Sequence, residues 1–480
     1  MPAFARLLGL VALAAAVPSA SAQTASAAHA DRVARIEADL VPALVIENEP
    51  REPVGIAARM AELGVPGVSV AFFEGGEVVW TRAYGLADVE GGDPVTPETR
   101  FQAASISKPV AATAALDLVE DGRLGLDDDV NGALASWHVP ETAFDGPVTL
   151  RGLLTHTAGL TVHGFPGYGP AEAVPTTAGV LAGEGNTDAV VVDQRPRTAY
   201  RYSGGGYTVA QLLVEDATGR PFADVLADRV LGPLGMAHST YAQPLPAGLR
   251  DQAATGYRAG GAPVEGRFHT YPEQAAAGLW TTPTDLARWA LAIRQSLDGA
   301  PHPVLDAETV RLMVTPDAVG GHGLGPALPF DAAFFGHNGA NEGFRCLLTV
   351  QLDGDQGLVV MTNSDLGTVV AREILLAVAR EYAWGHYEPT RKTVVALPAD
   401  RLAGLAGRYR GVERPGWVVT MRAEGGELVA ELGWNDGRVR LAAESETAFF
   451  DRDDGMPVVF DAAPATAFTV QGLRFERVEE

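Results

Sequence analysis

The chain has little cysteine and little lysine. Its 480 residues include a single cysteine, Cys346, which excludes an intramolecular disulfide and any cysteine-rich zinc or iron–sulfur site. Only two of its 36 basic residues are lysines, Lys108 and Lys392. Against these stand 60 acidic residues, so the formal net charge is −24. An acidic chain without a basic run is not expected to bind nucleic acid. The hydrophobic share, 47%, is large enough for a packed core and excludes global disorder.

The N-terminus has the three regions of a secretory signal. Arg6 supplies a positive charge, residues 7–17 form an apolar run, and Ala20-Ser21-Ala22 is a small-residue cleavage site. The run is shorter than the roughly 20 residues that a spanning helix needs, so stable membrane insertion is not expected. We predict a signal peptide over residues 1–22 and export to the periplasm or the medium. A disordered alanine-rich tail is the alternative.

The main part of the chain mixes strands and helices. Two apolar runs at 68–73 and 78–84 flank Glu74-Gly75-Gly76-Glu77 and predict a hairpin. A helix is expected from Ser105 to Asp121, and strands at 345–352 and 358–362. Strand pairs at both ends with helices between them indicate one mixed α+β domain. The helical spacing of Val33, Ile36, Leu40 and Leu44 also predicts a helix over 31–44.

The composition shifts near the C-terminus. Short strand-like runs separated by Gly-Gly and Asn-Asp-Gly turns predict a small barrel or sandwich; they lie at 417–422, 427–432, 438–441 and 457–460. We therefore predict a main domain over 23–386, a linker over 387–397 and an all-β domain over 398–480.

Ser105 and Lys108 form the first chemical motif. Residues three apart on a helix share a face, so the hydroxyl and the amine can meet. A serine becomes a useful nucleophile only beside a base, and lysine can serve if burial lowers its pKa from about 10.4 by roughly 3 units. Arginine cannot lose its proton in a protein. A serine three residues before a lysine also arises by chance, so the motif requires supporting context.

That context comes from two further motifs, Tyr202-Ser203-Gly204 and His337-Asn338-Gly339. In this order the three motifs resemble the serine β-lactamase and penicillin-binding protein superfamily. The resemblance is closest to its class C-like, peptidase S12-type branch, which includes D-aminopeptidases and family VIII esterases. It covers about Ala57 to Ala383 and is supported by the runs at 153–160, 233–236 and 361–363.

The resemblance implies a role for each matching residue. Ser105 would be the acylated nucleophile, and Lys108 and Tyr202 would share the general base and acid work. The backbone N–H groups of Ser105 and Ala340 would form the oxyanion hole. The residues that would line the substrate site are His337, Asn338 and Gly339. The fold implied is an antiparallel sheet with a helical subdomain, followed by a lipocalin-like barrel.

Two positions depart from the β-lactamase pattern. Gly204 stands where asparagine is frequent, and His337-Asn338 stands where true β-lactamases have Lys-Thr. Both favour a peptidase or an esterase. We therefore predict an exported serine hydrolase that forms an acyl-enzyme on Ser105 and cleaves a small amide or ester, such as a D-amino-acid peptide or a cell-wall fragment. The alternatives are a true β-lactamase and a non-catalytic binding or scaffold protein.

No cofactor or metal is expected. The chain has no His-Glu-x-x-His motif and no paired cysteines, and His156 within Thr155-His156-Thr157 is expected to brace a turn. The expected partner is a small-molecule or peptide substrate. For the C-terminal domain, shaping the substrate channel and a stabilising or oligomerising role both stay open, and the sequence does not give the oligomeric state.

Overall fold

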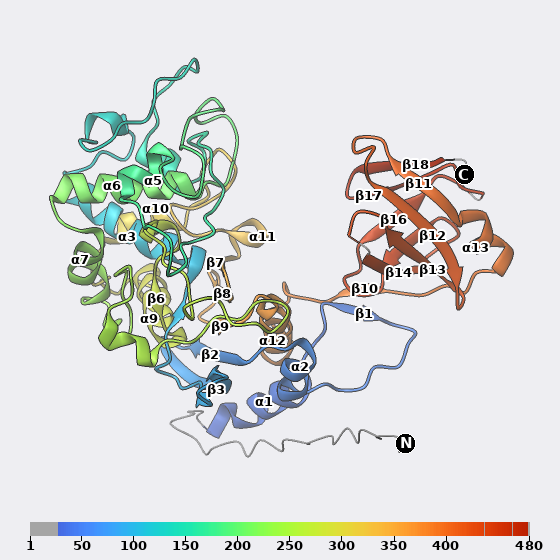
Figure 1. Cartoon of the computed structure of the whole chain (residues 1–480). Coiled ribbons are helices and arrows are strands. Elements are labelled where there is room, and N and C mark those ends of the chain that lie inside the picture. The colour runs from blue at the N-terminus through green and yellow to red at the C-terminus, as the bar shows by residue number, and fades with distance from the viewer. Residues whose placement is uncertain (1–26, 436, 463, 479–480) are drawn as a thin grey trace, which may run out of the picture. The chain divides into compact units, whose positions relative to one another are not determined.

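The computed structural model describes residues 27–435, 437–462 and 464–478 (Figure 1). The predicted signal peptide, residues 1–22, lies outside them, and export stays a prediction. By its internal contacts the chain divides into two compact units. The first includes Gly64–Gly367, and the second combines Ala30–Leu63 with Thr368–Glu480. The domain boundaries predicted at 386 and 397 stay predictions. Among the described residues, no helix has the length and hydrophobicity required to cross a membrane.

A six-stranded antiparallel sheet forms the centre of the first unit. Its strand order is β4-β3-β2-β9-β8-β7. The strands are β2 (Gly67–Glu74), β3 (Glu77–Asp88), β4 (Asp93–Pro94), β7 (Phe334–Asn341), β8 (Phe344–Gln351) and β9 (Gly357–Thr362). The early hairpin joins the late strands through the β2–β9 pair, in which Val68 faces Thr362. This confirms the mixed α+β fold and the predicted strand pairs.

The β2–β3 hairpin turns on two glycines. Glu74 pairs with Glu77, and Gly75 and Gly76 between them have φ of 62° and 86°. Two consecutive positive φ values are what a type I′ hairpin turn requires, and glycine adopts them without a Cβ clash. The Gly-Gly pair therefore fixes the register of the hairpin that the sequence predicted.

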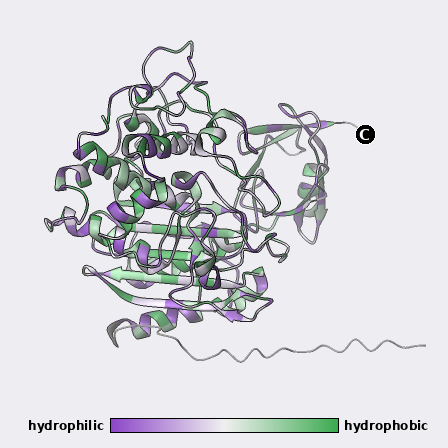
Figure 2. Ribbon diagram, turned by 60° about the vertical axis from the view of Figure 1, so that its left-hand side comes forward, coloured by the Kyte–Doolittle hydropathy of each residue, from purple (hydrophilic) through white to green (hydrophobic). Residues whose placement is uncertain are grey.

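The helices of the first unit cover the sheet and build a helical subdomain. Helix α9 (Pro283–Leu297) packs on β2 and β9, and α3 (Ser107–Glu120) packs against α6 (Gly204–Thr218) and α8 (Gln274–Ala277). Figure 2 shows hydrophobic colour along the strands of the sheet, in agreement with a core between sheet and helices. The remaining elements are η1 (Ala104–Ile106), η2 (Val130–Gly132), α4 (Leu150–Leu154), α5 (Thr177–Ala182), α7 (Phe222–Leu226), η3 (Ala227–Leu231), η4 (Ala247–Gln252), α10 (Ala307–Met313), α11 (Pro329–Ala332), β5 (Phe101–Gln102) and β6 (Trp280–Thr281).

The helix predicted from Ser105 to Asp121 begins differently. Ala104–Ile106 form a 3₁₀ turn, and the α-helix starts at Ser107 and ends at Glu120. Pro109 lies in the first turn of the helix, where its missing N–H would have no intrahelical partner. Ser105 therefore stands on a tighter turn just before the helix that holds Lys108.

The second unit contains a closed eight-stranded antiparallel barrel, which confirms the predicted C-terminal β-domain. Its strands run in chain order and close through β11 and β18. They are β11 (Gly407–Gly411), β12 (Val418–Glu424), β13 (Glu427–Leu432), β14 (Gly437–Ala443), β15 (Ala448–Asp451), β16 (Pro457–Phe460), β17 (Ala467–Val470) and β18 (Leu473–Val478). The sequence predicted four of these strands. Its interior holds a separate hydrophobic cluster that includes residues of α13 (Ala399–Leu405).

The same unit contains most of α1 (Ala27–Ala38) and of α12 (Gly367–Tyr382), the helix α2 (Ile56–Leu63) and a short parallel pair, β1 (Leu44–Ile46) with β10 (Thr390–Lys392). The prediction of a helix reaching Leu44 was wrong, because Pro42 disfavours the helical conformation at Val41. Lys392, the second lysine of the chain, lies on β10 and pairs with Glu444 at 2.8 Å.

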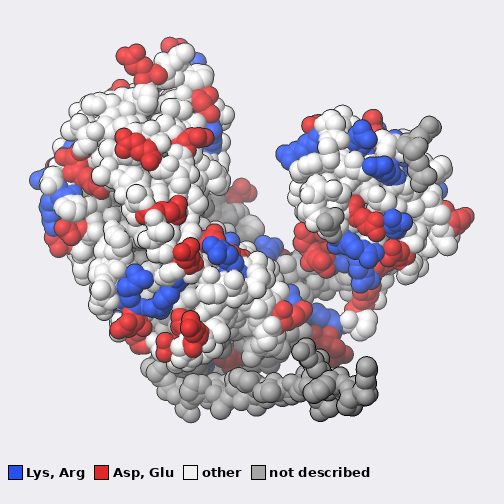
Figure 3. Space-filling view, in the orientation of Figure 1, with Lys and Arg blue, Asp and Glu red and all other residues white. Residues whose placement is uncertain are grey.

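The surface carries charges of both signs. On the face drawn in Figure 3, basic and acidic groups alternate over much of the surface instead of separating into one basic stripe. Many arginines are engaged in ion pairs, such as Arg59 with Glu373 at 2.8 Å and Arg151 with Asp127 at 2.7 Å. The arginines of this acidic protein therefore serve largely as structural partners of carboxylates.

Candidate active site

Ser105 and Lys108 meet at the start of α3. The Lys108 Nζ lies 3.0 Å from the Ser105 Oγ. Ser107, between them, is buried, and its Oγ accepts a hydrogen bond from the Leu279 N–H at 3.0 Å. Ala104, just before the serine, has a positive φ of 51°, which is uncommon for alanine. The serine hydroxyl therefore stands on a turn that its neighbours hold in place.

Lys108 is one of the most deeply buried charged side chains of the described residues, with 2% of its surface exposed. Its Nζ donates a hydrogen bond to the Ala276 carbonyl at 2.7 Å and lies 4.9 Å from the centre of the Tyr202 ring and 5.7 Å from that of Tyr207. Burial disfavours the charged form and lowers the pKa of Lys108 from 10.5 to about 7. A substantial fraction of the amine is therefore neutral at neutral pH.

Tyr202 immediately precedes the Ser203 that caps helix α6. The Ser203 Oγ accepts a hydrogen bond from the Gly206 N–H at 2.9 Å and donates one to the Thr161 carbonyl at 2.7 Å. The Tyr202 hydroxyl hydrogen bonds with Ser105, while burial raises the pKa of Tyr202 above its usual 10.0. The phenol therefore keeps its proton at neutral pH and can donate it.

The packing around position 204 explains why this residue is glycine. A Cβ at this position would lie 3.0 Å from the Phe165 ring and 3.1 Å from the His163 carbonyl oxygen. Those distances are closer than a side chain tolerates without displacing its neighbours. Segment 163–165 thus occupies the space that a side chain at position 204 would need.

Strand β7, at the edge of the sheet, runs beside the 3₁₀ turn of the serine. A Cβ on Gly339 would lie 2.2 Å from the Ala103 carbonyl oxygen, so only glycine permits this approach. The next residue, Ala340, pairs with Arg345 of β8. Asn341 is 4% exposed, and its amide donates to Gln102 at 2.8 Å and to the Ala277 carbonyl at 3.1 Å. These bonds hold β7 to α8, the helix whose carbonyl contacts Lys108.

The side chains of His337 and Asn338, in the third motif, differ in exposure. His337 is half-buried and close to Tyr202, with 5.9 Å between ring centres, whereas Asn338 is exposed. The His337 Nδ1 lies 2.6 Å from the Asn338 carbonyl oxygen. Burial lowers the pKa of His337 to about 3, so this imidazole is neutral at neutral pH. The structure thus brings His337 and Gly339 to the serine site, and Asn338 contributes its carbonyl to the histidine.

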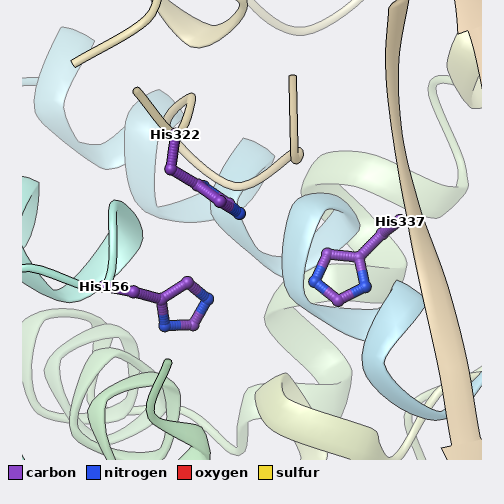
Figure 4. Close-up of side chains that lie close together, drawn as sticks. All are labelled: His156, His322 and His337. Carbon is purple, nitrogen blue, oxygen red and sulfur yellow. The ribbon is translucent and has the colours of Figure 1, made fainter. Parts of the chain in front are cut away.

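Three histidines lie close together near the serine site, as Figure 4 shows. Ligand atoms of His156, His322 and His337 lie within 4.8 Å of one another. The His156 ring packs against the Tyr202 ring, with 4.2 Å between ring centres and an interplanar angle of 30°, and its Nδ1 accepts a hydrogen bond from the Ser203 N–H at 3.1 Å. The sequence predicted that His156 braces a turn; in the structure it holds the main chain of the tyrosine motif.

The protonation pattern of these histidines decides what they can hold. A carbonyl can only accept a hydrogen bond, so the Nδ1 atoms of His322 and His337 carry protons toward Gly323 and Asn338, and their Nε2 atoms keep lone pairs. His156 is the reverse: its Nδ1 accepts a hydrogen bond, so its Nε2 carries the proton. This buried Nε2 has no hydrogen-bond partner among the residues that the structure describes. The cluster thus offers two metal-ligand atoms and one N–H donor, fewer than the three lone pairs of a three-histidine metal site.

The sequence indicated Ser105, Lys108 and Tyr202 but missed other groups that lie around them. His322 has no motif around it, and the Ala276 carbonyl is a main-chain group that no pattern of side chains reveals. Only the fold places the Ala276 carbonyl at Lys108 and the His322 ring against that of His156.

Comparison with known proteins decides the family. The family model described as Beta-lactamase matches residues 56–382. The chain belongs to the beta-lactamase family. This confirms the predicted superfamily.

Relatives within the family include hydrolases of two kinds. The D-aminopeptidase of Gluconobacter oxydans (strain 621H) is 29% identical over 376 residues, which covers 75% of this chain and 67% of that protein. Esterase EstB of Burkholderia gladioli is 32% identical over 265 residues, covering 48% of this chain and 66% of that one. Protein flp of Staphylococcus aureus (strain MW2) is 26% identical, and the match spans only 45% of its length. The chain is accordingly a serine hydrolase of the beta-lactamase-related type.

Solved structures support the same fold. The octameric penicillin-binding protein homologue from Pyrococcus abyssi has a TM-score of 0.60 at 22% identity and covers 88% of this chain and 98% of its own. The crystal structure of SurE with D-Leu has a TM-score of 0.56 at 24% identity, with 88% and 97% covered. At these identities the likeness shows the fold alone.

Gly339→Ala tests the close approach of β7 to the serine turn. The new methyl would lie 2.2 Å from the Ala103 carbonyl oxygen, so the strand must move away from the turn. A displacement of about 1 Å in an active site lowers turnover about 100-fold. We expect that loss in kcat/KM on a p-nitrophenyl ester, with an unchanged circular dichroism spectrum.

The matched control is Gly248→Ala, because a Cβ at Gly248 meets no heavy atom within 4 Å. It should keep the activity of the parent protein. Equal rates for the two variants would contradict the role assigned to the β7 contact.

Proposed function

We propose that the protein forms an acyl-enzyme on Ser105 and cleaves a small amide or ester. The observation that supports this most is the 3.0 Å contact between the Ser105 Oγ and a buried lysine amine whose pKa is lowered to about 7. A serine hydroxyl needs a base at hydrogen-bond distance, and a base works best when its pKa lies near the operating pH. The joint presence of nucleophile, base and phenol argues against a non-catalytic scaffold.

In the first step the neutral Lys108 amine takes the proton of the Ser105 hydroxyl. A neutral amine has two N–H groups and one lone pair. The Ala276 carbonyl accepts one N–H at 2.7 Å, and the lone pair is available to the serine hydroxyl at 3.0 Å. The Ser105 Oγ then bonds to the substrate carbonyl carbon, and the carbonyl oxygen becomes an oxyanion. In this proposal the N–H groups of Ser105 and Ala340 stabilise that charge.

In the second step the bond to the leaving group breaks. The proton now on Lys108 returns to the leaving nitrogen or oxygen by way of the Tyr202 hydroxyl, which stays protonated because burial raises its pKa. Water then attacks the carbonyl carbon of the acyl-enzyme and gives a proton to Lys108. The bond between that carbon and the Ser105 Oγ breaks, the Oγ takes back a proton from Lys108, and the acid product leaves. The neutral imidazole of His337 lines this site and orients the substrate.

For the substrate we propose an amide or peptide of a D-amino acid, with small acyl esters as a related class. A relative that matches 75% of this chain is named a D-aminopeptidase, and another is named an esterase. The glycine at 204, with segment 163–165 filling the adjacent space, removes the side-chain amide that β-lactams would meet there. The true β-lactamase stays the second candidate because the family model has that description.

Labelling with a fluorophosphonate tests the nucleophile. We expect intact-mass analysis of the parent protein to show a single adduct, because Ser105 is the serine activated by a neighbouring base. Ser105→Ala should show none. An equal adduct on both proteins would contradict the assignment, as would the absence of an adduct on the parent protein.

The pH dependence of turnover tests the base. Lys108 must be neutral to accept a proton, so kcat/KM should rise with pH through a midpoint near 7, its lowered pKa. Lys108→Arg keeps the charge but cannot lose its proton, and we expect a loss of about 1,000-fold.

Lys392→Arg is the matched control, since it replaces the only other lysine of the chain in the same way. Its ion pair with Glu444 suits arginine equally, and its pH profile should match that of the parent protein. A Lys108→Arg variant of near-normal rate would refute the base assignment.

A panel of three substrates separates the candidate activities. We expect hydrolysis of a D-alanine p-nitroanilide or of a p-nitrophenyl acyl ester, and little or no turnover of a chromogenic cephalosporin, because the substrate site departs from the β-lactamase pattern at Gly204 and at His337-Asn338. Rapid cephalosporin turnover without cleavage of the other two would establish the β-lactamase instead.

A further inference from the structure

The barrel of the second unit encloses a cavity of about 190 Å³. It lies within one domain and involves none of the groups of the serine site. The side chains that line it are mostly apolar and come from inward-facing positions of the strands, among them Met421, Ala430, Leu441, Val458, Phe468 and Phe475. Asp451 and Gln471 are the polar residues of the lining.

The barrel interior is filled in one region and hollow in another. The rings of Tyr409, Phe449 and Phe460 pack on one another, with 6.2 Å and 5.4 Å between their centres, and none of them lines the cavity. Leu402 and Leu405 of α13 belong to the same cluster of buried side chains. The hollow region is therefore a local feature in a barrel that is otherwise packed with side chains.

Two tryptophans form part of the cavity wall. Trp417 and Trp434 stack with 4.6 Å between ring centres and an interplanar angle of 18°. Arg414 lies over the Trp417 ring at 4.3 Å, and 36% of the surface of Trp434 is exposed. The stacked pair thus reaches from solvent to the cavity, where it can report an occupant by its fluorescence.

We propose that this cavity is a binding site for a small, uncharged aromatic molecule of a single ring. An engineered apolar cavity of about 150 Å³ binds benzene and xenon, so the volume here suits one ring with a short substituent. An eight-stranded barrel has an interior just wide enough for side chains or one small ligand. The lining offers aromatic faces and edges for offset or edge-to-face contacts.

The charge of the lining sets the selectivity. It contains no lysine or arginine, and burial raises the pKa of Asp451 because the ionised form is poorly solvated there. A carboxylate ligand would meet this acidic group without a cationic partner, which is unfavourable in an apolar site. The site should therefore take toluene and reject benzoate, which has the same ring.

Titration of the full-length protein with toluene and with benzoate, followed by tryptophan fluorescence, tests the proposal. We expect a saturable change with toluene and none with benzoate. Ala430→Leu should weaken toluene binding about tenfold or more, because its added carbons fill the space that the ring needs. Ala403→Leu, the same change at an exposed position of α13, should bind as the parent protein does.

Xenon under pressure gives a second readout that needs no variant. Diffraction from crystals of the parent protein should show xenon inside the barrel, between Ala430 and the Trp417–Trp434 pair. The proposal is overturned if toluene gives no saturable signal, if Ala430→Leu binds it unchanged, if benzoate binds equally, or if xenon is absent from the barrel. None of these outcomes depends on the chemistry at Ser105.

Discussion

The buried amine of Lys108 is the constraint on which the rest of the site depends. Burial, rather than a neighbouring positive charge, lowers its pKa, and a single carbonyl, that of Ala276, accepts one of its N–H groups. Two aromatic rings occupy the space around it. The carbonyl comes from α8 and both rings from the start of α6, so α3, α6 and α8 must pack together before the lysine is buried beside Ser105. The packing of these helices therefore keeps water away from the Lys108 amine.

Two glycines determine the walls around that amine. Gly204 lets segment 163–165 approach the tyrosine motif, and Gly339 lets strand β7 approach the serine turn. Neither has a positive φ, so backbone conformation is not the reason for glycine at either position. Close packing is the reason, because neighbouring atoms leave no room for a Cβ at either position. The absence of a side chain at Gly204 and at Gly339 therefore helps to shape the site.

The sequence predicted the parts of the fold that depend on local patterns. Turn glycines revealed the β2–β3 hairpin, and the spacing of Ser105 and Lys108 revealed the pair that meets at 3.0 Å. The sequence did not predict the features that depend on contacts between distant parts of the chain. The barrel strands that it missed are short, and two of them, β11 and β18, place charged residues beside buried ones. His322 reaches the site from a loop without a motif. The contribution of the Ala276 main chain has no side-chain signal at all. Pro42, which ends the first helix early, was a local signal that helical periodicity outweighed.

The central sheet also has a consequence for synthesis of the chain. Strand β2 lies between β3 and β9, and β9 ends at Thr362, nearly three hundred residues after Val68. Pairs so distant in sequence form slowly, because the loop must close before the contact stabilises anything. During translation the early hairpin therefore has an open edge until most of the chain has left the ribosome. A polypeptide that cannot complete its central sheet early remains accessible to chaperones for most of its synthesis.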